Sequence, residues 1–116
     1  MKLLPGYWLS EPKVYRATRE CNGEVVAITN PDAVLVLDED PPERLMVIGQ
    51  GTVVAVAPCR VKVFGNGMLV CAEGEGVRLE VDGKAVVHAE NGAEVLVKGP
   101  EVKVRGLNAR VSVLEK

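Results

Sequence analysis

The sequence predicts an all-β protein of the β-solenoid or β-prism type, made of short strands that repeat about every eight residues. One phrase recurs nine times: an apolar residue, any residue, an apolar residue, any residue, and then a small or turn-forming residue. The closing residues follow one another at steps of 8, 8, 9, 9, 8, 8, 7 and 9. Such a constant short period indicates one structural unit stacked on itself. The phrases begin at Leu45, Val53, Val61, Val70, Leu79, Val87, Val95, Val102 and Val111.

The pattern inside each phrase predicts one buried and one exposed face. Side chains alternate along a strand, so the first and third residues of a phrase share a face. That face carries only Val, Leu and Ala, whereas the opposite face is mostly charged or polar from Lys62 onward. The closing glycines, and Asn91 in one phrase, are residue types that tolerate a positive φ, so we expect corners there.

A second rhythm indicates how the strands are arranged. The third position alternates between large and small, as in Val47, Ala55, Val63, Ala72 and Val81. This alternation predicts two strands per coil of about 17 residues, so that like side chains stack on like at a spacing of about 4.8 Å. The alternative is an antiparallel meander that closes into a barrel or sandwich, in which Val81 would pair with Val87 across a three-residue loop.

The segment before the repeat, residues 1–23, is predicted to be an N-terminal arm or cap, and residues 24–116 a single repetitive β-domain. Three of the four aromatic residues, Tyr7, Trp8 and Tyr15, lie in this first segment. They could dock on a neighbouring subunit, or cap the open end of the chain's own core. Residues 10–21 could form a helix capped by Ser10, or a strand from Val14; we favour the strand.

Degenerate phrases begin at Val26 and Val34, eight residues apart. Residues 39–44 then lengthen the next step to eleven, and the two prolines and several acidic residues in this segment predict a surface loop. Its carboxylates lack the alternating spacing of a calcium loop, so we expect them to be solvated.

Composition narrows the class of protein. At 116 residues the chain is long enough for one domain, and 22 valines against one Phe and one Trp suit thin, repetitive β-layers. The formal net charge of −2 argues against nucleic-acid binding. No segment has the ~20 apolar residues of a membrane span, and the N-terminus does not resemble a secretory signal. We therefore expect synthesis in a cytoplasm and no membrane partner. Abundant Glu, Arg, Val and Pro are typical of thermophiles.

No motif predicts an enzyme, a cofactor or a metal. The one histidine, His88, has no nucleophile near it in the sequence, and Ser10 and Ser112 lie near the chain ends. Three cysteines without a Cys-x-x-Cys pair indicate reduced thiols. A zinc site made of Cys21, Cys59, Cys71 and His88 is not expected, because Cys71 and His88 point outward and Cys59 lies in a corner.

Five phrases resemble the Val-x-Gly octads of phage tail central-spike proteins and the related type VI secretion tip proteins. In that family three chains wind into a triangular β-prism, apolar inside and polar outside, that serves as a rigid structural element. The resemblance covers roughly residues 45 to 115, without a His-x-His metal-binding tip. It implies a virion structural role and a homo-oligomer such as a trimer. The phrases are Val47-Ile48-Gly49, Val63-Phe64-Gly65, Val81-Asp82-Gly83, Val97-Lys98-Gly99 and Val104-Arg105-Gly106.

The functional hypothesis is therefore a non-enzymatic, self-associating structural protein, such as a spike, tail or capsid-decorating component of a virion. Outward apolar residues in the first phrases require a covering, by the N-terminal arm or by another subunit. Two alternatives remain: a cellular scaffold that binds a protein partner, and a barrel that binds a small molecule or metal if the meander closes. The predicted interface residues are Tyr7, Trp8, Tyr15, Met46, Ile48, Val54, Val56 and Phe64.

Overall fold

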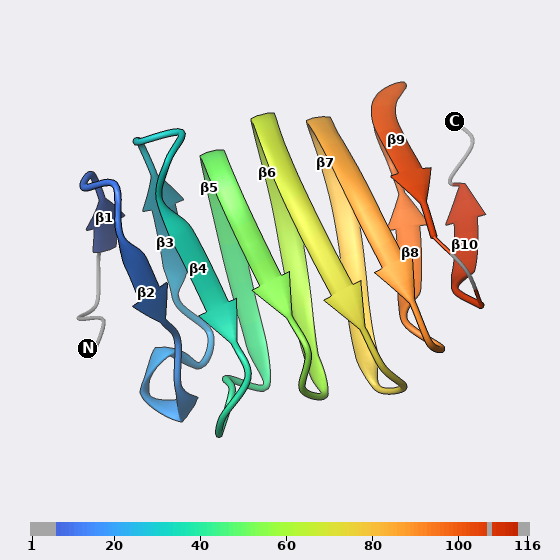
Figure 1. Cartoon of the computed structure of the whole chain (residues 1–116), viewed down its shortest axis with the longest axis horizontal. Helices are drawn as coiled ribbons and strands as arrows, with labels where there is room; N and C mark the ends of the chain where they lie inside the picture. Colours follow the sequence, from blue (N-terminus) through green and yellow to red (C-terminus); the bar gives the residue numbers. More distant parts are fainter. Residues whose placement is uncertain (1–6, 107, 114–116) are drawn as a thin grey trace.

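The computed structural model describes residues 7–106 and 108–113, which form ten β-strands and one turn of 3-10 helix, η1 (Figure 1). Strand formation follows the sequence, because valine and other β-branched residues favour extended backbone. The elements are β1 (Tyr7–Leu9), β2 (Val14–Arg16), η1 (Arg19–Cys21), β3 (Val25–Ile28), β4 (Val34–Leu37), β5 (Arg44–Ala55), β6 (Cys59–Glu73), β7 (Val77–Glu90), β8 (Glu94–Val97), β9 (Glu101–Arg105) and β10 (Arg110–Val113).

The strands wind into a two-layered β-solenoid of about six turns, which confirms the predicted fold class. Strands β5, β6 and β7 each turn a corner midway, so their first halves lie in one layer and their second halves in the other (Figure 1). We call the layer of β1, β3, the first halves of β5 to β7, β8 and β10 the first sheet. The second sheet holds β2, β4, the second halves of β5 to β7, and β9.

Strand pairing is parallel throughout the described residues, and the register confirms the predicted coil. From β5 onward, paired residues are separated by 16 to 18 positions, close to the predicted 17. Val63 lies between Val47 and Val81, and Ala72 lies between Ala55 and Ala89. Valine therefore stacks on valine, and alanine on alanine, as predicted. The meander alternative is wrong, because Val81 pairs with Val63 and Val97 rather than with Val87.

Burial follows the predicted faces through seven phrases. The first and third residues of every phrase from Leu45 to Val97 are buried, and no polar or charged side chain is buried among the described residues. The eighth phrase is only half-buried. In the ninth phrase Val111 and Val113 are 47% and 65% exposed, because no coil among residues 7–106 and 108–113 covers them. The solenoid therefore has a dry interior that opens at its C-terminal end.

Two glycines show why the corners require this residue. Gly83 has a φ of +80°, and a side chain there would also collide with the backbone of Gly65 in the neighbouring coil. Gly65 itself does not have a positive φ, but a Cβ atom would lie 2.6 Å from the carbonyl oxygen of Lys84. Asn91 adopts the expected positive φ of 53°. Corners in this fold are thus limited by backbone conformation and by close stacking of the coils.

Residues before the repeat continue the two sheets. β1 pairs in parallel with β3, and β2 pairs in parallel with β4. The predicted strand from Val14 is confirmed by β2. The alternative prediction, a helix capped by Ser10, is wrong, because the first helical turn is η1. The segment of residues 38–43 is a loop, as predicted, and it lengthens the separation of paired residues between β3 and β5 to 21.

The described segments contain no helix that is long and apolar enough to cross a membrane.

Candidate functional site

The outer side of the first sheet, here called the first face, gathers four of the predicted interface residues. Trp8, Ile48 and Phe64 belong to one row that runs across neighbouring strands, with Ala27 between Trp8 and Ile48. Trp8 is 71% exposed and Phe64 is 54% exposed. Met46 lies in the adjacent row beside Val25, and both are exposed. The outward apolar side chains of this face therefore form a continuous patch.

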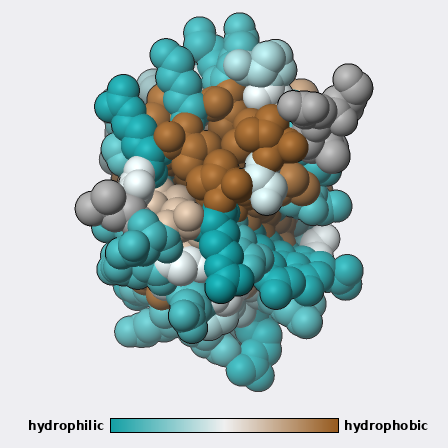
Figure 2. Space-filling view, turned by 90° about the vertical axis from the view of Figure 1, so that its right-hand side faces the viewer, coloured by the Kyte–Doolittle hydropathy of each residue, from teal (hydrophilic) through white to brown (hydrophobic). Residues whose placement is uncertain are grey.

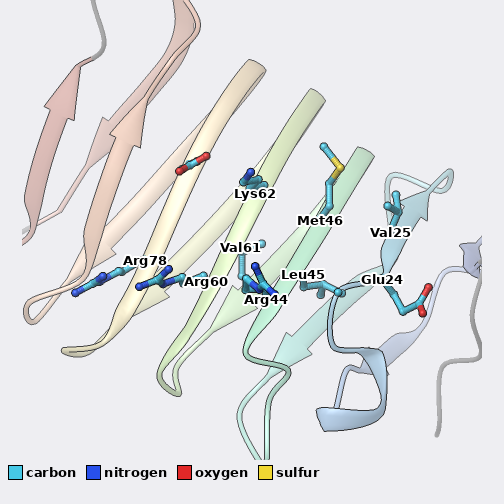
Figure 3. A pocket seen from close by; sticks show the side chains of 11 residues that line it. Glu24, Val25, Arg44, Leu45, Met46, Arg60, Val61, Lys62 and Arg78 are labelled. Atoms are coloured by element: carbon cyan, nitrogen blue, oxygen red, sulfur yellow. The ribbon is translucent and has the colours of Figure 1, made fainter.

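A row of arginines borders this patch. Arg44, Arg60 and Arg78 are direct partners on successive strands of the first sheet, which places them about 4.8 Å apart along the solenoid axis. Figure 3 shows the three side chains in line along a groove whose wall also includes Val25 and Met46. Arg78 forms an ion pair of 3.1 Å with Glu94. Arg44 and Arg60 form no ion pair with any residue that the structure describes.

The outer side of the second sheet, the second face, is also apolar. It carries the predicted residues Val54 and Val56, of which Val56 is 45% exposed. The register adds residues that the sequence-based prediction omitted, and these form two rows with Val54. The alternation of side chains along each strand could have identified them as outward apolar residues. They are Val14, Val34, Val36, Leu69 and Val86.

Two strands of the second sheet, β6 and β7, end in acidic residues. Glu73 and Glu90 are direct partners on neighbouring strands, and both are exposed. Beside them Cys71 pairs with His88. Burial, and then the charge of Glu90, raise the pKa of the Cys71 thiol. The second face thus has an apolar centre and an acidic edge.

A third apolar surface is the open C-terminal end of the solenoid. Figure 2, which faces this end, shows a compact hydrophobic patch surrounded by hydrophilic residues. Val111 and Val113 are exposed there, and the half-buried side chains of Val102, Val104 and Ala109 pack against the core. The end also presents strand edges, because in the described part of the chain β9 pairs only with β7 and β10 only with β8. Unpaired edges of this kind are ready templates for other strands.

One of the predicted interface residues, Tyr15, does not join these surfaces. Tyr15 lies in the core with 6% of its surface exposed, where it packs near the N-terminal end of the solenoid. The two ends therefore differ, since Leu9, Tyr15 and Ala17 are buried whereas Val111 and Val113 are exposed. The side chain of Tyr7 lies outside the described residues.

Of the residues weighed for metal binding or catalysis, only Cys71 and His88 are neighbours, as direct partners on β6 and β7. Cys21 and Cys59 are buried, Cys71 is half-buried on the second face, and no disulfide joins the three. Burial raises the pKa of the Cys59 thiol to about 11. Within residues 7–106 and 108–113, no group of three or more His, Cys, Asp and Glu side chains is placed to hold a metal ion.

The arrangement defines a class of protein, a short parallel β-solenoid whose outer faces carry exposed apolar side chains beside charged ones. Comparison of the chain with protein-family models, with curated proteins and with solved structures found no match in any of the three.

Proposed function

We propose that this chain is a non-enzymatic structural protein that associates with copies of itself, as a virion component such as a spike, tail or capsid-decorating protein. One observation carries the proposal: large hydrophobic side chains are exposed on both outer faces of a rigid body. Contiguous apolar surface of this kind is characteristic of interaction sites. The residues are Trp8, Val14, Val25, Met46, Val56, Phe64 and Leu69, together with Val111 and Val113 at the open end.

The chemistry of the described surface supports a structural role. Ser10, beside β1, and Ser112, near the C-terminal end of the first sheet, do not converge with His88 on the second face. Cys71 is the direct partner of His88 on the neighbouring strand, but burial and the charge of Glu90 raise the pKa of its thiol, which disfavours the nucleophilic thiolate. Nucleophilic catalysis requires a nucleophile within hydrogen-bonding reach of its base. The virion role is supported by the Val-x-Gly phrases, and the two-layered coil departs from a triangular prism.

The same surfaces favour a second candidate, a cellular scaffold whose faces bind a different protein. The third candidate, a ligand-binding barrel, required the antiparallel meander that the parallel pairing excludes.

Sedimentation velocity of the full chain over a wide concentration range tests self-association. We expect the mass to rise with concentration, and we expect Phe64→Glu to weaken this rise because it places a charge in the first face. The matched control is Asn66→Glu, which adds the same charge at an exposed corner two residues away. A monomer at every concentration would refute self-association and favour the scaffold.

A further inference from the structure

We infer that copies of this protein stack laterally, with the first face of one copy against the second face of the next. This inference rests on the proposed self-association and specifies its geometry. Because the two contacting surfaces are different, the contact is heterologous, and a translation that repeats it produces an open stack rather than a closed ring.

The first argument is the position of the charges. Each face carries like charges directly opposite one another on neighbouring strands: Arg44, Arg60 and Arg78 on the first face, and Glu73 and Glu90 on the second. Arg78 is paired with Glu94, so the unbalanced charges of the first face are those of Arg44 and Arg60. Like charges in this relation are unfavourable within a sheet. Opposing rows from two copies would relieve both repulsions.

The two charged rows lie along the same edge of the solenoid. Glu73 ends the second-sheet strand of its coil, the corner of residues 74–76 follows, and Arg78 lies at the start of the next first-sheet strand. A translation perpendicular to the sheets keeps this edge in place. It therefore brings the arginine row of one copy over the glutamate row of the other. Along the solenoid axis, each arginine would then lie within about one strand spacing of a glutamate.

The apolar rows coincide under the same translation. Phe64 and Leu69 flank the opposite corner of one coil, so the row of Trp8 and Phe64 would contact the row of Val14 and Leu69. The middle rows match in their apolar part, where Met46 of one copy would lie over Val36 or Val54 of the other. The polar parts of the same rows, Lys62 with Glu80 and Cys71 with His88, would also face each other.

The available area agrees with a weak but specific contact. The molecule measures 34 Å along its longest axis. Three outward rows about 6.6 Å apart span roughly 13 Å from the first row to the last. A stack would thus bury on the order of 1,000 Å² in total at each contact, near the lower limit for a specific interface. We therefore expect assembly to depend on concentration.

A charge exchange between the faces tests the inference. Arg60→Glu and Glu73→Arg each place like charges across the contact, and the double variant restores opposite charges with the original net charge. Both side chains are exposed, so we expect the variants to fold, which circular dichroism would verify. Glu75→Arg is the control, because it makes the same charge change in the corner between the sheets.

The readout is the concentration at which stacks form, measured by sedimentation velocity at low salt. Each single variant should raise this concentration by about fivefold or more, given the energies of exposed ion pairs. The double variant and an equimolar mixture of the two single variants should both restore assembly. The Glu75→Arg control should assemble like the unmodified chain.

Three results would overturn the inference in distinguishable ways. Single variants that assemble normally, or a double variant that assembles no better than they do, would exclude contact between these faces. A mass that stops at a dimer or trimer would exclude an open stack and leave self-association intact. A monomer at every concentration would refute the proposed function as well.

Discussion

Replacing Val81 by aspartate perturbs the column of valines that organises the interior of the first sheet. Val81 is fully buried, with Val63 on one neighbouring strand and Val97 on the other. The same column ends at Val113, which pairs with Val97 and is 65% exposed. The same substitution at Val113 is therefore a matched control, because Val113 belongs to the same column but is not buried.

The expected loss at Val81 has two parts. Removing a buried valine side chain from the core costs about 2 kcal/mol of transfer free energy. Burying a carboxyl group without a partner adds about 3 kcal/mol or more, even if it takes up a proton. Their sum of about 5 kcal/mol is comparable to the total stability of a small domain, so we expect most molecules to unfold or to melt far earlier. At Val113 the loss should stay below about 1 kcal/mol.

Urea denaturation followed by circular dichroism measures both variants against the unmodified chain. Burial raises the pKa of the introduced carboxyl group in the folded state above its unfolded value of about 3.9. The charge-dependent part of the Val81→Asp deficit should therefore be absent below about pH 4 and grow as the pH rises. A deficit below about 1 kcal/mol at pH 7 would refute the assigned face. An equal deficit at Val113 in a monomeric sample would show that the C-terminal end is covered.

Two further outcomes concern the corners and the thiols. Gly83→Ala should cost about 1–3 kcal/mol more than Gly67→Ala in urea denaturation. Both glycines have a positive φ, but only at Gly83 would the added Cβ meet another backbone, so equal losses would refute the close stacking. With a thiol reagent at pH 8, Cys71 should react slowly and faster as the pH rises, whereas Cys59, whose pKa is about 11, should react only on unfolding. Rapid labelling of Cys59 in the folded chain would contradict its burial.

Much of the fold could be predicted from the sequence, because the phrase that begins at Leu45 encodes both the strand period and the buried face. The alternation of Val47, Ala55 and Val63 even indicated the coil length, since like side chains stack when two strands complete a turn. From the sequence, Trp8 and Phe64 could be recognised as candidate interface residues, but the sequence did not show that they belong to one row of the first face. Their alignment depends on Ala27 and Ile48, which lie in coils with different loop lengths.

The sequence by itself determined the side of each strand on which a residue lies, because alternation is a local property of extended backbone. The tertiary structure alone decided which residues became neighbours along the solenoid axis, because that depends on the number of residues in every corner. Arg44, Arg60 and Arg78 are separated by unequal intervals, and only the register of the coils makes them one row. Val81 and Val113 occupy the same position of their phrases, yet one is buried and the other exposed, because burial also requires a following coil.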